Sequence, residues 1–144
     1  MAKVEMNFES NLPEAKQKLQ SAQKAGLIAA LLVIEKYAKN YSRTARQGGG
    51  GTRDSYTYEL NTDGVKLIGA VGSDEMNAIY EEYGTGEFAE KGDGRKGGWV
   101  YYDDVDGKFY FTYGKTPNKP LRRAGSVSRS EVQQLIGEHF SLEF

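Results

Sequence analysis

The chain of 144 residues contains no cysteine and a single histidine. Without cysteine the protein can hold neither a disulfide framework nor a thiolate zinc site, and this composition suits a reducing cytoplasm. The densest apolar run, residues 26–34, is about half of the roughly 18 residues that a membrane span needs. Because the first residues also lack the apolar core of a signal peptide, we expect neither export nor a membrane partner.

The chain also lacks an excess of either charge, since it has 19 basic and 20 acidic residues and a net charge of -1. Such a chain creates no overall field that would draw it to nucleic acid or to a membrane. The distribution is uneven: residues 1–46 carry eight basic and four acidic groups, residues 47–90 two and nine, and residues 91–144 nine and seven. This segmentation either orients subunits against one another or is ordinary solvated surface.

A helical pattern extends from Leu12 to Tyr41, where small and apolar residues recur every 3.6 positions. We expect Asn11 to cap this helix and Pro13 to lie in its first turn. Four residues lie off the main stripe and make the helix apolar nearly all round: Leu27, Ile28, Leu31 and Leu32. A helix of this kind needs burial on every side. Either a neighbouring subunit covers the second face, which we favour, or the terminal segments of the same chain cover it.

The rest of the chain alternates strands and short helices. Residues 56–60 and 65–71 flank an Asn-Thr-Asp-Gly turn, and residues 99–102 and 108–113 form a second, strongly aromatic pair of strands. Between the two pairs we expect a short helix that Ser73 caps and Gly84 ends. Its apolar face consists of Met76, Ile79, Tyr80 and Tyr83. A last helix is expected from Leu121 onward.

These elements predict one α+β domain over residues 1–144. A long N-terminal helix and a C-terminal helix are expected to pack on a small antiparallel sheet of two hairpins, with the short helix between the hairpins. Four consecutive glycines at positions 48–51 predict a flexible loop over residues 43–54, because glycine has the largest conformational entropy to lose.

No catalytic or metal-binding constellation stands out. Residues 92–97 match G-x-G-x-x-G, but a strand follows them where a dinucleotide site needs a helix. The aspartates at 103, 104 and 106 fail the spacing of a calcium loop and fit a hairpin turn. Glu81 and Glu82 would diverge by about 100° on a helix, and His139 has no catalytic neighbour in the sequence. We therefore expect no enzyme, no cofactor and no metal.

Arginine is placed so that nucleic-acid binding stays an alternative. Arg43, Arg46 and Arg53 flank the glycine loop, and Arg122, Arg123 and Arg129 cluster near the last helix. Basic loops with exposed tyrosines can grip phosphates and stack on bases without reading their sequence. No known nucleic-acid-binding motif accompanies them.

Glycine and aromatic residues follow a fixed order between residues 78 and 124. This segment includes Tyr83-Gly84-Thr85-Gly86, then Gly94-Arg95-Lys96-Gly97-Gly98-Trp99-Val100-Tyr101, then Pro117-Asn118-Lys119-Pro120-Leu121-Arg122-Arg123-Ala124. This order resembles the small head-to-tail connector proteins (neck or tail-completion proteins) of long-tailed phages and prophages. Two departures are Gly51-Thr52-Arg53-Asp54-Ser55, where relatives usually have Thr-Gly-x-Leu-Arg-x-Ser, and Pro120, where an aromatic often stands.

The resemblance implies a structural virion protein. Such a subunit forms a homo-oligomeric ring that joins the DNA-filled capsid to the tail tube and leaves a channel for the viral DNA. Its partners would be head-closure and tail-terminator or tail-tube proteins, and its place the head-tail junction of the virion after synthesis in the host bacterial cytoplasm. We expect Leu27, Ile28, Leu31 and Leu32, with Arg122 and Arg123, at the interface with subunits or partners.

The motif residues are expected to act through architecture. The set is Tyr80, Tyr83, Gly84, Thr85, Gly86, Arg95, Gly97, Gly98, Trp99, Pro117 and Leu121. We expect Gly84 to hold a left-handed helix cap. We also expect Trp99 to bury its ring over the apolar face of the short helix.

Overall fold

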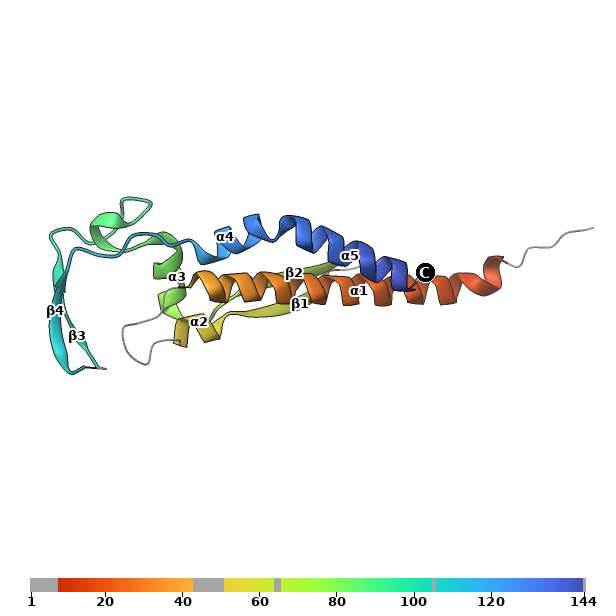
Figure 1. Cartoon of the computed structure of the whole chain (residues 1–144), viewed down its shortest axis with the longest axis horizontal. Coiled ribbons are helices and arrows are strands. Elements are labelled where there is room, and N and C mark those ends of the chain that lie inside the picture. Colours follow the sequence, from red (N-terminus) through yellow and green to blue (C-terminus); the bar gives the residue numbers. More distant parts are fainter. Residues whose placement is uncertain (1–7, 43–50, 64–65, 105, 144) are drawn as a thin grey trace, which may run out of the picture.

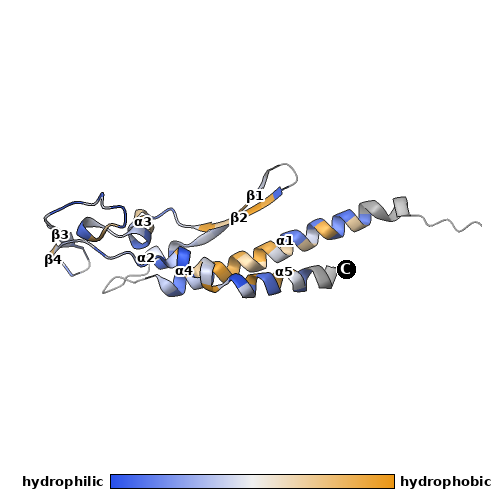
Figure 2. Cartoon of the chain, turned by 90° about the horizontal axis from the view of Figure 1, so that it is seen from above, coloured by the Kyte–Doolittle hydropathy of each residue, from blue (hydrophilic) through white to orange (hydrophobic). Residues whose placement is uncertain are grey.

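The computed structural model describes residues 8–42, 51–63, 66–104 and 106–143. It is an elongated α+β structure built along helix α1, Phe8–Tyr41 (Figure 1). The β1–β2 hairpin, Thr57–Asp63 and Lys66–Gly72, lies on one side of α1, and α5, Arg129–Glu143, lies on the other (Figures 1 and 2). The expected fold class, with its long first helix and C-terminal helical segment, is thus confirmed.

Helix α1 begins at Phe8, so the prediction that Asn11 caps it is wrong. Asn11 and Pro13 both lie inside the helix. Pro13 is the sixth residue of α1, beyond the first four N–H groups that have no partner within a helix. Its missing N–H therefore removes one bond of the helix, which nevertheless extends upstream to Phe8.

One face of α1 carries small residues at a spacing of four: Ala22, Gly26 and Ala30 are all buried. At Gly26 an added Cβ would lie 3.5 Å from both the Cβ of His139 and the Cα of Ile136. The small side chains therefore let α5 approach closely. His139 is half-buried at this contact.

The opposite face of α1 packs on the first hairpin through Leu31. This side chain is only 3% exposed, and a Cβ added at Gly69 of β2 would come within 2.6 Å of its Cδ1 atom. The prediction that Leu31 faces another subunit is wrong, because β2 and the C-terminal helices cover the apolar middle of α1 within the chain (Figure 2). Leu27 and Ile28 are half-buried, and Leu32 remains 50% exposed.

Replacing Leu31 tests this packing. Leu31→Ala is expected to lower the free energy of unfolding by about 2.5 kcal/mol, since it removes a buried side chain and leaves a cavity. Leu32→Ala, the adjacent matched control, is expected to change it by less than about 0.5 kcal/mol. Urea unfolding of both variants measures the difference. Equal effects at the two positions would contradict the placement of Leu31.

The two antiparallel hairpins are present, but they form two separate two-stranded sheets. Only β1–β2 lies against α1; β3–β4, Trp99–Asp103 and Lys108–Thr112, stands at one end of the molecule (Figure 1). Tyr56, expected to open the first strand, precedes β1. Its side chain joins Ala38, Ala78 and Ala124 in a small buried cluster.

Helix α3, Met76–Tyr83, ends at Gly84 as expected, with φ at 78° and a bond from the Gly84 N–H to the Tyr80 carbonyl (2.9 Å). Its ψ of 176° lies outside the left-handed helical region. Ser73 does not cap α3. Its hydroxyl accepts the N–H of Glu75 at 3.0 Å and pairs with the hydroxyl of Ser55, so it supports the turn before the helix.

The C-terminal helical segment is divided into α4, Pro120–Val127, and α5, with a break at Ser128. The expected loop at 43–54 is corrected at its end, because Gly51–Ser55 forms the short helix α2. Residues 43–50 of that loop lie outside the described residues. Among the helices that the structure describes, none is long and apolar enough to cross a membrane.

Candidate functional site

Helix α3 turns its acidic side inward. Glu81 and Glu82 are 1% and 5% exposed, whereas the expected apolar face of Met76, Ile79, Tyr80 and Tyr83 is exposed to solvent. The prediction that Trp99 buries its ring over that face is therefore wrong. The two glutamates face inward because other segments of the chain donate hydrogen bonds to their carboxylates.

Glu82 binds the start of α4. Its carboxylate accepts the N–H groups of Leu121 (3.0 Å) and Arg122 (3.1 Å) and the Arg122 Nε at 2.8 Å. The first N–H groups of a helix have no partner within it and carry a partial positive charge, so a carboxylate stabilises them. We call this contact the Glu82–Arg122 bridge. It fixes α4 against the end of α3.

The guanidinium of Arg122 continues to Glu90. Nη1 and Nη2 each donate to one carboxylate oxygen of Glu90 at 2.9 Å, a geometry that gives strong and specific pairing. The hydrogen bonds that Arg122 donates to Glu90 and then to Glu82 raise the pKa of Arg122, and the bond accepted from Arg122 lowers the pKa of Glu90. A carboxyl with a lowered pKa stabilises the fold above its unfolded-state pKa and loses that effect as pH falls through the folded value. The contact between Glu90 and Arg122 is therefore expected to lose its stabilising effect as pH falls through the lowered pKa of Glu90.

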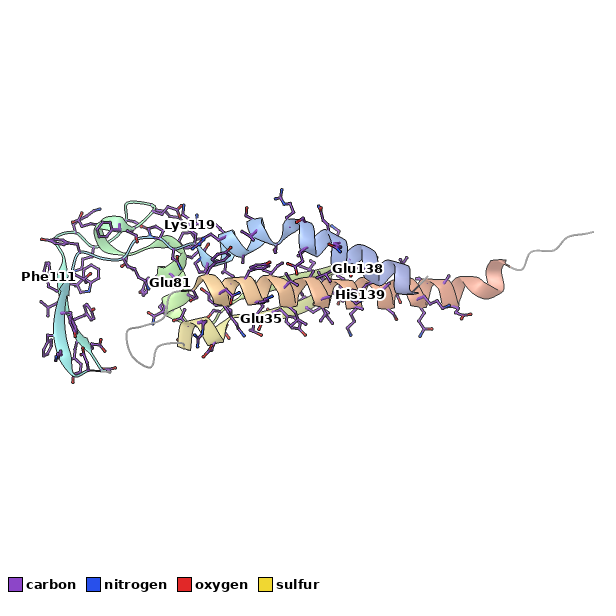
Figure 3. The ribbon with its side chains drawn as sticks, viewed as in Figure 1. Glu35, Glu81, Phe111, Lys119, Glu138 and His139 are labelled. Carbon is purple, nitrogen blue, oxygen red and sulfur yellow. The ribbon has the colours of Figure 1, made fainter. Side chains whose placement is uncertain are left out.

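Glu81 holds the proline turn. Its carboxylate pairs with Lys115 and accepts from Asn118 Nδ2 at 3.1 Å, and its carbonyl accepts the Asn118 N–H at 2.8 Å. Asn118 also donates to the Tyr41 carbonyl at the end of α1. Lys119, next in the chain, is the one non-glycine residue with a positive φ, 57°, in the part of the chain that the structure describes. Helices α1, α3 and α4 thus meet at these contacts, which Figure 3 marks at Glu81 and Lys119.

The glycines after α3 lie against the chain that leaves β4. Gly86 has φ at 61°, and a Cβ there would overlap the carbonyl oxygen of Tyr113. Gly114 has φ at 120°, and a Cβ there would overlap the carbonyl of Thr85. Thr85 donates its N–H to the Lys115 carbonyl at 2.8 Å. A side chain therefore cannot be accommodated at either glycine. The close backbone contact at these two positions holds the second hairpin against the end of α3.

An open cavity of about 880 Å³ lies beside this junction. Aromatic and cationic residues from α3, the following loop and β3 line it, among them Tyr80, Tyr83, Lys91, Arg95, Trp99 and Tyr101. We call it the groove. The Lys91 ammonium lies 5.2 Å from the centroid of the Tyr83 ring, and the Arg95 guanidinium 5.6 Å from that of Trp99. Such contacts hold cations over ring faces.

Trp99 is half-buried in this groove, with its ring against Gly86. Trp99→Ala is consequently expected to lower the free energy of unfolding by only about 1–2 kcal/mol, less than the loss of a fully buried ring. Trp99→Phe, which keeps an aromatic ring, is the control and is expected to lose less. Guanidinium unfolding followed by circular dichroism measures both. A loss as large as that of a core tryptophan would contradict the half-buried position.

The arginines at the expected interface are engaged within the chain. Arg122 forms the bridge, and Arg123 lies 4.1 Å from the Tyr41 ring centroid and donates to Asn118 Oδ1 at 3.1 Å. Arg53 pairs with Asp54, while Arg43 and Arg46 lie outside the described residues. Among the residues described, no group of three or more His, Cys, Asp or Glu side chains could hold a metal ion.

The sequence did not indicate the Glu82–Arg122 bridge. The available signal was two adjacent acids at the end of a short helix, followed by three cations in the last motif, Lys119, Arg122 and Arg123. The remaining motif residues gather here: Gly97 donates its N–H to Glu87 at 2.8 Å, and Gly98 has φ at 74°. Pro117 lies against Gly84, and Leu121 packs on the Tyr56 cluster.

Comparison of the chain with family models, with curated proteins and with solved structures finds no match.

Proposed function

We propose that this chain is a structural subunit of the head-to-tail connector of a long-tailed phage or prophage. In this role it forms a ring that joins the DNA-filled capsid to the tail tube and leaves a channel for DNA. The proposal rests on the resemblance of residues 78–124 and on one structural observation, the exposure of the β3–β4 hairpin.

The hairpin presents large apolar side chains to solvent on one face, which we call the open face. Its members are Val100, Tyr102, Phe109 and Phe111, exposed by 62%, 53%, 71% and 57%. A contiguous exposed apolar patch marks a surface that binds another protein. An isolated two-stranded hairpin is also marginally stable in water and needs a covering surface. This hairpin is therefore best understood as a contact element.

The motif residues support that role by fixing the hairpin to the helical body. Gly86 and Gly114 bring the two backbones into contact, and the Glu82–Arg122 bridge holds α4 on α3. These contacts join backbone segments and helices to one another, and the function we propose is assembly. The partners are other copies of this chain, the adjacent head-closure and tail-terminator or tail-tube proteins, and viral DNA that passes without sequence-specific binding. The place is the head-tail junction of the virion, after synthesis in the host bacterial cytoplasm.

The test is to inactivate the reading frame in the genome that carries it and to image the particles by electron microscopy. DNA-filled heads and complete tails that fail to join are expected, and the wild-type chain supplied in trans should restore joining. Joined particles in the absence of the protein would refute the proposal. Joined particles that lack DNA would instead favour the nucleic-acid-binding alternative.

A further inference from the structure

We infer that the open face of the β3–β4 hairpin of one chain packs into the groove of a second copy of the same chain. This inference rests on the proposed function, since it names the surfaces that would join neighbouring subunits in the ring. It follows from the strand register, from the position of the groove and from the chemistry of the two surfaces.

The register separates the side chains of the hairpin into two faces. Val100 stands opposite Phe111, and Tyr102 opposite Phe109. Because alternate residues of a strand point to opposite sides, these four share the open face. Trp99, Tyr101 and Thr112 belong to the other face, and all three line the groove. The open face and the groove therefore lie on opposite sides of one hairpin.

Because the two surfaces lie on opposite sides, the groove of a chain cannot cover the open face of the same chain. The helices described offer no cover either, because the hairpin stands beyond the end of α1, where Figure 3 marks Phe111. A contact between opposite sides of one element in two copies is heterologous. It leaves one unused surface of each kind, so it repeats from subunit to subunit and closes into a ring when the rotation permits. A ring is the assembly that the proposed function requires.

The two surfaces are also chemically complementary. The groove offers the rings of Tyr80, Tyr83 and Trp99, beside the exposed Ile79. Aromatic side chains of the open face would meet these rings in tilted or edge-on contacts, which add to the gain from apolar burial. The end of the hairpin carries the carboxylates of residues 103, 104 and 106 beside Lys108. The groove is lined by the cations Lys91, Arg95 and Lys115 and by the acids Glu90 and Asp93. The excess of acid on the hairpin and of cations in the groove favours one orientation of the partner.

The absence of native cysteine makes a direct test possible. Phe109→Cys and Ile79→Cys proteins are mixed at high concentration and treated with a short bis-maleimide crosslinker. We expect a covalent dimer that contains one chain of each variant. Phe109→Cys mixed with Lys18→Cys, at an exposed position of α1, is the control and is expected to give no such dimer.

Three results would overturn the inference. These are the absence of the mixed dimer, a Phe109–Phe109 dimer as the main product, and a mixed dimer no more abundant than in the control. A Phe109–Phe109 product would mean that the open faces pair with each other, and a chain that stays monomeric would mean that a different protein covers the open face.

Trp99 provides an independent signal because it is the one tryptophan of the chain and lies in the groove. Its fluorescence is expected to shift to shorter wavelength as concentration rises and assembly proceeds. The double variant Phe109→Ser, Phe111→Ser is expected to keep the melting temperature but to show no shift. A normal shift in this variant would refute the inference.

Failure of the inference and failure of the proposed function are distinguishable. If heads and tails require the protein for joining but no mixed dimer forms, the docking of the hairpin into the groove is wrong and the connector function stands. If the mixed dimer forms but heads and tails join without the protein, the contact is real and the connector function is wrong.

Discussion

Gly86→Ala is expected to lower the free energy of unfolding by about 4 kcal/mol. The added methyl group would overlap the Tyr113 carbonyl oxygen and come within 2.8 Å of the Trp99 ring. Overpacking of this kind costs roughly 1–3 kcal/mol, and a non-glycine residue at φ of 61° adds roughly 1–2 kcal/mol. Thermal and urea unfolding measure the loss. Hydrogen exchange should show that residues 84–88 and 113–115 lose protection together.

Gly92→Ala is the matched control for this variant. Its φ is also positive, at 71°, but a Cβ there meets nothing within 4 Å. It should therefore show the backbone penalty alone, about 1 kcal/mol. If the two variants lose the same stability, the close contact between Gly86 and the strand exit is not real.

Glu82→Ala is expected to lower the free energy of unfolding by about 3 kcal/mol. The change removes a buried carboxylate that satisfies two N–H groups of α4 and one guanidinium N–H. Breaking one partner of a buried ion pair costs roughly 3–5 kcal/mol. We expect the lower end of that range, because Arg122 keeps its contacts with Glu90 and with solvent.

Glu90→Gln distinguishes the contribution of the Arg122–Glu90 contact from that of the Arg122–Glu82 contact. Glu90 pairs with Arg122 at the surface, where ion pairs contribute little because solvent screens them. Its replacement should cost far less than that of Glu82 at pH 7, as measured by urea unfolding. An equal loss at both positions would mean that the contribution of Glu82 comes from charge alone and not from its place at the start of α4.

The elements that could be predicted from the sequence are those with a long or local signal. The apolar repeat of α1 and the aromatic strand pair at residues 99–102 and 108–113 depend on neighbours a few positions apart, and both elements are confirmed. The inward face of α3 depends on Arg122, which lies 40 residues from Glu82 in the chain. A helix of eight residues gives too few positions for its periodicity to show which side is buried. Its apolar side was therefore mistaken for the core.

The candidate site was predicted in the same uneven way. Gly84 and Gly86 both have positive φ, as glycine at a helix end and in a tight turn allows, but the left-handed cap expected at Gly84 is wrong because its ψ is 176°. The groove beside them is lined by residues of α3, of the following loop and of β3, and no short segment of the sequence contains all of these. Leu31 was assigned to a subunit interface because the apolar character of α1 does not reveal which partner, β2 or another chain, covers it.

The most direct test of the connector proposal is electron cryo-microscopy of particles that the encoding genome produces, with a reconstruction of their head-tail junction. Our account predicts a ring of density at the junction into which α1, the β1–β2 hairpin and α5 fit, around an open axial channel. Intact, joined particles whose junction contains no density for this fold would contradict it.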